Sequence, residues 1–183
     1  IEVCLVGSEM CIRDRATVLN AEEHGRFLSY LATTRQPLQN KAIYLLGYRA
    51  GLRIGSIAGL GLNDVLDPSG ELKEVVHLRK DIVKNRSNYS VYLSHPELRQ
   101  ALLDYIAARP ESEVDNLFVS QKNTAFSANA LSHKMLKLFR EAGFDGASSH
   151  SQRRSFATNC IQAGVDIVTC LLYTSDAADE GGS

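Results

Sequence analysis

Apolar side chains recur every three or four positions along most of the chain, which is the spacing of helices that bury one face. Cap-forming residues bound several of these stretches, with Asn20 and Ser127 at predicted starts and Gly51, Gly143 and Gly164 at predicted ends. The pattern predicts helices over about 20–33, 38–50, 94–108, 127–142 and 149–164, and a short helix from a corner at 52–53 to residue 59.

Two tetrapeptides have the form of a capping box, in which side chains three positions apart satisfy the free amides of a first helical turn. They are Ser94-His-Pro-Glu97 and Ser149-His-Ser-Gln152, so we expect Ser94 and Ser149 to cap the helices that follow.

The segment from 74 to 94 favours strands. Runs at 74–79 and 88–94 are rich in β-branched and aromatic residues, and a polar, basic link at 84–87 separates them. Asp67-Pro-Ser-Gly70 precedes them as a strong turn signal. The expected fold class is α+β, mainly helical, with one small antiparallel β-hairpin inserted.

Composition and charge narrow the class of protein. The 183 residues are 44% apolar and 22% charged, which is typical of a globular protein with one packed domain and argues against disorder. No apolar run approaches the roughly 18 residues that span a bilayer. The net charge is −1, but residues 16–169 carry 18 basic and 15 acidic side chains, so this middle is mildly basic.

Both ends resemble translated sequencing-adapter read-through, as in Val3-Cys-Leu-Val-Gly-Ser-Glu9 and Cys170-Leu-Leu-Tyr-Thr-Ser-Asp176. We therefore expect 1–15 and 170–183 to be artefactual segments and 16–169 to be the folded domain. Of the four cysteines, Cys160 alone lies in that domain, where it is expected to be a small buried hydrophobe in a reducing, cytoplasmic compartment.

Three clusters could carry chemistry. Arg53 follows Gly51 at a helix-to-helix corner, where its guanidinium could contact a phosphate or simply be solvated. Lys84 lies in the hairpin link, with Lys80 and Arg86 close by; such cations can enter a DNA groove or only keep an edge soluble.

The third cluster is His150-Ser-Gln-Arg153-Arg154-Ser-Phe-Ala-Thr158. His150 and Arg153 are three positions apart in a first helical turn, so they share a face near the positive end of the helix dipole. A phosphate-like ligand and an ordinary surface cap explain this arrangement equally well. Metal hydrolysis has little support, because no two of the five histidines lie four positions apart.

Gly51-Leu-Arg53-Ile, Lys84 before Val91-Tyr-Leu-Ser94, and His150-x-x-Arg153 with Phe156-Ala-Thr158 together resemble the catalytic domain of the tyrosine recombinase (phage integrase) family. The resemblance covers about 16–169. It implies site-specific DNA recombination or integration by phosphotyrosine strand exchange, on double-stranded DNA, as a homo-tetramer on paired sites, with neither metal nor other cofactor.

The resemblance also implies a role for each residue. Arg53 and Arg153 would clamp the scissile phosphate, Lys84 would donate a proton to the leaving 5′-oxygen, and His150 would assist proton transfer. Lys80, Arg86 and Arg154 would contact DNA. Arg154 departs from the family, which often has histidine there.

The nucleophilic tyrosine is the main departure from the family pattern. Tyr173 lies 20 positions after Arg153, too few for the intervening helices that the family requires, so we reject it and expect the nucleophile beyond residue 183. The chain as written would then be inactive. The alternatives are a DNA-binding remnant that does not cleave and, ranked lower, a type IB topoisomerase.

Overall fold

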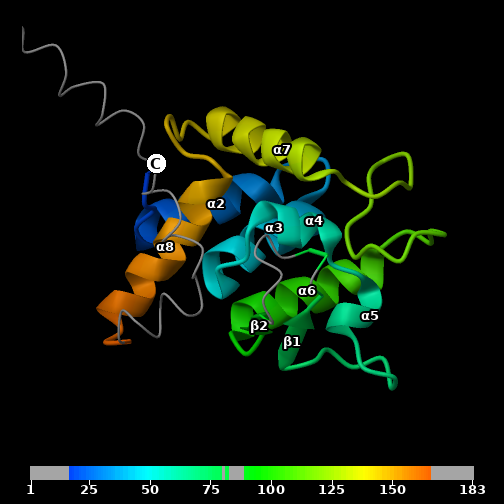
Figure 1. The fold of residues 1–183 in the computed structure, drawn as a ribbon. Coiled ribbons are helices and arrows are strands. Elements are labelled where there is room, and N and C mark those ends of the chain that lie inside the picture. The colour runs from blue at the N-terminus through cyan, green and yellow to red at the C-terminus, as the bar shows by residue number, and fades with distance from the viewer. Residues whose placement is uncertain (1–16, 80, 83–88, 166–183) are drawn as a thin grey trace, which may run out of the picture.

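The computed structural model describes residues 17–79, 81–82 and 89–165. The described residues form seven helices and one pair of strands (Figure 1): α2 (Ala21–Ala32), α3 (Pro37–Ala50), α4 (Ile54–Gly59), α5 (Leu62–Val65), β1 (Val75–Leu78), β2 (Tyr89–Tyr92), α6 (Pro96–Ala108), α7 (Ala128–Glu141) and α8 (Ser149–Gln162). The predicted α+β class, mainly helical with a small antiparallel sheet, is confirmed. The four-residue α5 was not predicted, because one turn carries no detectable periodicity.

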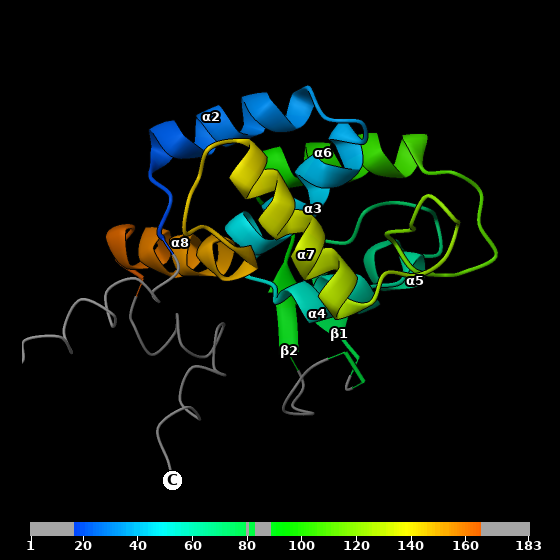
Figure 2. The same cartoon turned by 90° about the horizontal axis from the view of Figure 1, so that it is seen from above.

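Helix α3 lies at the centre of the molecule. Its residues from Ala42 to Leu46 are completely buried, because α2, α4, α6 and α8 all contact it. Figure 2 shows these helices around α3, with α7 crossing in front. A helix enclosed in this way is apolar around most of its circumference and fixes the position of everything that packs on it.

An aromatic cluster joins three of the helices. Phe27 of α2 stacks on Phe139 of α7 with ring centroids 4.2 Å apart, and it meets Tyr44 of α3 edge-on at 4.8 Å. Phe144, just after α7, closes the cluster at 5.6 Å from Phe27. Such pairs contribute about 0.5–1.5 kcal/mol each beyond the burial of their area.

The hairpin alternates as expected for a sheet with one buried face. Strands β1 and β2 pair antiparallel, with Val76 opposite Val91 and His77 opposite Ser90. Val76 and Val91 are buried, whereas His77 is exposed and its Nδ1 lies 2.8 Å from Ser90 Oγ. The apolar face therefore packs on the helices.

The N-caps predicted for α6 and α8 are each displaced by one residue. His95, not Ser94, caps α6, and its Nδ1 accepts a hydrogen bond from the Glu97 amide. Ser148, not Ser149, caps α8. By contrast, Asn20 and Glu23 form the capping box that begins α2, and Ser127 caps α7. Among the described residues, no helix combines the length and hydropathy needed to cross a bilayer.

Candidate phosphate-binding site

Arg53 lies at a corner that the backbone fixes tightly. Gly51 ends α3 in the left-handed conformation with φ of 65°, and the Leu52 amide donates back to the Leu46 carbonyl at 3.1 Å. Arg53 then caps α4 in an extended conformation, and its carbonyl accepts from the Ile57 amide. The Arg53 side chain is half-buried, with Nε enclosed. The corner holds the start of this side chain in one place, as the sequence suggested.

The start of α8 is built from serines. Ser148 Oγ accepts from the His150 amide at 3.3 Å, and the Ser148 amide donates to Ser151 Oγ at 3.0 Å. Further along, Ser155 Oγ accepts from the Leu19 amide at 2.8 Å and donates to the Ser151 carbonyl. These bonds tie the first two turns of α8 to the N-terminal part of the domain.

The three residues of interest on α8 differ in exposure. His150 and Arg154 are exposed and Arg153 is half-buried. His150 and Arg153 lie one turn apart, so an anion at this point would meet an imidazole, a guanidinium and the positive end of a 14-residue helix.

Helix α8 lies along α3, and this packing brings two of the three clusters together. Gln152 sits against Gly47, and Phe156 sits against Gly51. Arg153 is three residues before Phe156, about 4.5 Å along the helix axis, so it lies within a turn of the corner that leads to Arg53. Segments a hundred residues apart in sequence thus meet at one place.

Phe156 is not the core residue that its apolar character suggests. It is half-buried and covers Gly51 with its ring, where a β-carbon would come within 2.5 Å of Cδ1. Its ring therefore packs at the contact between α3 and α8.

The cluster in the hairpin link lies outside the described residues, since these do not include Lys80, Lys84 or Arg86; Tyr173 lies outside them as well. The base of the hairpin, however, is fixed to α4. Ser56 Oγ donates to the Ile82 carbonyl at 2.8 Å, and the Arg79 guanidinium donates to the Gly59 carbonyl at 2.8 Å. Ile82, the last described residue before Lys84, therefore lies beside the helix that Arg53 begins.

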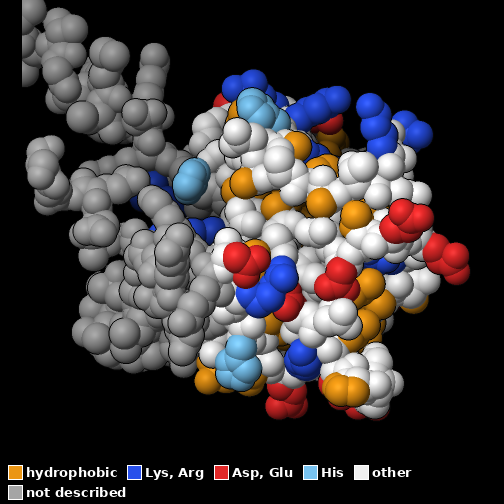
Figure 3. All heavy atoms as spheres, turned by 45° about the vertical axis from the view of Figure 1, so that its right-hand side comes forward, with side chains coloured by type: hydrophobic (Ala, Val, Ile, Leu, Met, Phe, Trp, Pro, Cys, Tyr) orange, Lys and Arg blue, Asp and Glu red, His pale blue; other side chains and the backbone are white. Residues whose placement is uncertain are grey.

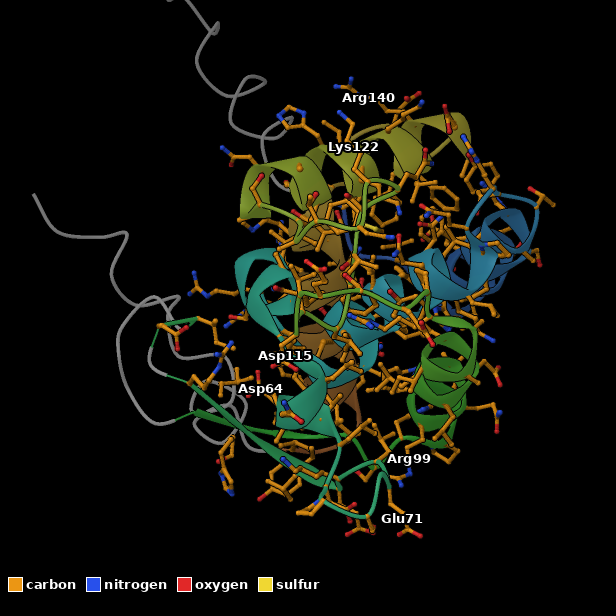
Figure 4. The ribbon with its side chains drawn as sticks, turned by 90° about the vertical axis from the view of Figure 1, so that its right-hand side faces the viewer. Asp64, Glu71, Arg99, Asp115, Lys122 and Arg140 are labelled. Carbon is orange, nitrogen blue, oxygen red and sulfur yellow. The ribbon has the colours of Figure 1, made fainter. Side chains whose placement is uncertain are left out.

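Besides its hydrogen bond to the Gly59 carbonyl, Arg79 forms an ion pair with a carboxylate. Arg79 Nε lies 3.3 Å from Asp64 Oδ2, and Asp64 accepts from the Gly61 amide at 2.8 Å. Figure 4 shows Asp64 and Asp115 close together at α5. Asp115 in turn accepts from Asn63 at 3.0 Å. Within the described ranges no three His, Cys, Asp or Glu side chains form a group that could hold a metal ion.

A basic face of α7 was not singled out from the sequence. His133, Lys137 and Arg140 are exposed and follow the i, i+4, i+7 spacing of one helix face. Figure 3 shows Lys and Arg side chains along the upper edge of the molecule, where α7 lies in Figure 1. The spacing could have revealed this face, but three separate basic side chains do not form a recognisable motif.

Solved structures share this fold. The structure of XerA recombinase aligns with a TM-score of 0.72 at 23% identity, over 88% of this chain and 57% of that one. XerH site-specific recombinase, bound to its difH substrate, aligns with a TM-score of 0.68 at 21% identity, over 88% of this chain and 48% of that one.

Sequence relatives lead to the same family. The chain is 31% identical over 160 residues to tyrosine recombinase XerD of Neisseria meningitidis, covering 82% of this chain and 51% of the relative. It is 28% identical over 138 residues to transposase A from transposon Tn554 of Staphylococcus aureus, covering 70% of this chain and 38% of the relative. The chain thus spans about half or less of the length of these curated relatives. The model of the phage integrase family matches residues 17–170, and the chain belongs to this family of tyrosine recombinases.

Proposed function

We propose that this chain carries the phosphate-binding part of the catalytic centre of a site-specific recombinase that breaks and rejoins double-stranded DNA. The observation that carries the proposal is the packing of α8 on α3, in which Gln152, the neighbour of Arg153, sits against Gly47, and Phe156 sits against Gly51, two residues before Arg53. Family membership supplies the reaction class, and the convergence of these cationic groups supplies a place for the phosphate.

In this proposal, Arg53 and Arg153 hold the scissile phosphate between two planar guanidinium groups. Each can donate two parallel hydrogen bonds to phosphate oxygens, and together they offset the charge that builds up as a fifth oxygen attacks phosphorus. The N-terminus of α8 adds its partial positive charge at the same point.

Two proton transfers complete the step. Lys84 donates a proton to the leaving 5′-oxygen, which would otherwise depart as a poor alkoxide leaving group. The anchoring of the hairpin base on α4 supports this role, because it holds Ile82, two residues before Lys84, against the helix that Arg53 begins. His150 assists the proton transfer from the attacking hydroxyl. Lys80, Arg86 and Arg154 contribute contacts to DNA phosphates.

The nucleophile is a tyrosine outside residues 1–183, which forms a covalent 3′-phosphotyrosyl bond that conserves the energy of the cleaved linkage. The greater length of the curated relatives supports this part. The family match over 17–170 likewise supports a folded domain at about 16–169. Further elements of the proposal are a homo-tetramer on paired DNA sites, chemistry without a cofactor, and a cytoplasmic location.

DNA binding by the full 183-residue chain tests the phosphate clamp. Fluorescence anisotropy with a duplex of about 30 base pairs, repeated over a range of salt concentrations, should show weak affinity that falls steeply with salt. Arg53→Ala and Arg153→Ala should each weaken binding and reduce the salt slope by about one. Arg35→Ala is the control, because Arg35 is exposed about 20 Å away, at the other end of α3.

The same mixtures, denatured in SDS, test the nucleophile. We expect no covalent protein–DNA adduct from this chain. An adduct that Tyr173→Phe abolishes would show that Tyr173 is the nucleophile after all. Equal salt slopes for the wild type, Arg53→Ala and Arg153→Ala would remove both arginines from the phosphate site, and binding without any role for them would favour a DNA-binding module that does not cleave.

A further inference from the structure

Helix α3 carries a groove that α8 fills. Gly47 and Gly51 are one turn apart on α3, and Gln152 and Phe156 are one turn apart on α8. A β-carbon on Gly47 would overlap Oε1 of Gln152 and lie 2.9 Å from its Cβ, and one on Gly51 would lie 2.5 Å from Cδ1 of Phe156. The two helices thus approach as closely as they do because neither glycine has a side chain.

Gly51 has a second reason to be glycine, because its φ is 65°. Gly47 has none: it lies inside a regular helix, where glycine weakens helix formation relative to alanine. A structural role alone would favour alanine there, with a smaller residue opposite. What glycine provides at this position is a short distance between α3 and α8.

Gln152 is an unfavourable choice for packing alone. Its side chain is 1% exposed, and in the described part of the chain its Nε2 is buried without a hydrogen-bond partner. A buried unpaired amide destabilises the fold relative to an apolar side chain of similar size. Gln152 is also the immediate neighbour of Arg153.

The helix cannot avoid a change at Gly47 by sliding. On its other sides α8 is held by the bond from the Leu19 amide to Ser155 Oγ and by Ser149 Oγ, which lies 3.3 Å from Ser132 Oγ. A larger residue at 47 would therefore tilt α8 away from α3 near Gln152, and the guanidinium of Arg153 would move relative to that of Arg53.

We propose that Gly47 and Gln152 are positioning residues that set the separation between Arg53 and Arg153, and thereby the fit of their guanidinium groups to one phosphate. This inference rests on the proposed function, since it takes the two arginines as a shared phosphate site. Bidentate binding depends on geometry, so a displacement of about 1 Å is enough to break one of the paired hydrogen bonds.

The experiment measures phosphate affinity separately from folding. The full chain is titrated with inorganic phosphate while the arginine Nε–H signals are followed by NMR, at a temperature where circular dichroism shows each variant to be folded. Gly47→Ala should bind phosphate roughly tenfold more weakly, which corresponds to the loss of one charge-assisted hydrogen bond. Gly25→Ala is the matched control, because Gly25 is also inside a helix and its β-carbon would meet nothing within 4 Å.

Two more variants keep the test decisive if Gly47→Ala does not fold. Gly47→Ala combined with Gln152→Gly removes the opposing β-carbon and should restore most of the affinity. Gln152→Ala alone leaves a void beside Gly47 and should weaken phosphate binding severalfold while α8 remains helical.

Each result decides between the two proposals. If Arg53→Ala and Arg153→Ala lose phosphate binding but folded Gly47→Ala and Gln152→Ala keep the wild-type affinity, the positioning role is wrong and the phosphate site stands. If neither arginine variant changes phosphate affinity, the shared site is wrong, and the positioning role falls with it.

Discussion

At the scale of single residues, Lys134 of α7 is a cation held by uncharged partners. Its Nζ donates to Oε1 of Gln36 at 2.9 Å and to Oε1 of Gln39 at 2.6 Å, and it lies 5.3 Å from the centre of the Phe126 ring. Burial lowers the pKa of this amine from its ordinary value of 10.5 to about 8. The contacts join α7 to the start of α3, at a cost in desolvation.

This pKa predicts how stability changes with pH. Between pH 8 and 10.5 the unfolded chain keeps a proton on Lys134 that the folded protein has lost, so stability rises with pH there by roughly 1–2 kcal/mol after allowance for solvent screening. Urea unfolding should show this rise in the wild type and not in Lys134→Met. Lys137→Met, on the exposed face of the same helix, should keep it; a rise that survives in Lys134→Met contradicts the assignment.

At the scale of elements, different residues at the start of α8 stabilise the helix and are proposed to bind phosphate. Ser148 supplies the cap oxygen, and the same first turn presents His150 and Arg153. A cap exchanged for alanine loses about 1 kcal/mol, whereas an aspartate caps equally well but adds a negative charge at the helix N-terminus. The two changes should therefore act on different properties.

We expect Ser148→Ala to lower the free energy of unfolding by about 1 kcal/mol with little effect on DNA affinity. Ser148→Asp should keep wild-type stability but weaken DNA binding, because its carboxylate repels the phosphate that His150 and Arg153 would bind. Chemical denaturation and anisotropy titrations measure the two quantities on the same samples. A Ser148→Asp variant that binds DNA as well as the wild type would place the phosphate elsewhere.

Local sequence patterns predicted most of the helices and strands, but few of the contacts between them. The long helices and the hairpin carry periodicity and end signals, so their positions could be inferred. The caps were displaced by one residue because neighbouring side chains offered similar local bonds, and tertiary contacts decided between them: Ser149 is buried beside Ser132, and Glu97 turns to Arg49.

The candidate site shows the same division. The corner at Gly51 and the helix start at His150 were visible in the sequence, but nothing local indicated that Gly47 would receive Gln152. The pairing of Arg53 with Arg153 came from family resemblance, because contacts between residues a hundred positions apart leave no periodic signal. The proposed pairing rests on the α3–α8 packing, in which Gln152 sits against Gly47 and Phe156 against Gly51.

At the scale of the whole molecule, one polar network joins α2, α3 and α6. Glu97 of α6 accepts from Arg49 Nε of α3 at 2.9 Å, and its Oε2 lies 3.4 Å from Nε2 of His24 in α2. His24 also stacks on Tyr48 with centroids 4.1 Å apart, and its Nδ1 lies 2.9 Å from the Tyr44 hydroxyl. The network lies on the side of α3 that faces α2 and α6.

Burial lowers the pKa of His24 below its ordinary value of 6.5, against the opposing attraction of Glu97, while the charges of Arg49 and His95 act in the same direction as burial. The unfolded chain therefore takes up a proton at this histidine at a higher pH than the folded protein does. As the pH falls through 6.5, proton uptake stabilises the unfolded state relative to the folded state and lowers the free energy of unfolding. The decrease is about 1.4 kcal/mol for each unit by which the pKa of His24 differs between the two states. The loss stops once the folded protein also binds the proton.

We predict that the wild type loses stability between pH 7 and 5, before most carboxylates titrate, and that His24→Gln removes much of this loss. His133→Gln, which changes an exposed histidine of α7, should leave the loss unchanged. Urea midpoints at closely spaced pH values measure the effect, with the variants compared at each pH. If His24→Gln and the wild type lose stability in parallel, the proton is taken up elsewhere. If their stabilities differ only below pH 6.5, the junction of α2, α3 and α6 is the acid-sensitive part of the fold. This junction lies on a different side of α3 from the Gly47–Gln152 contact.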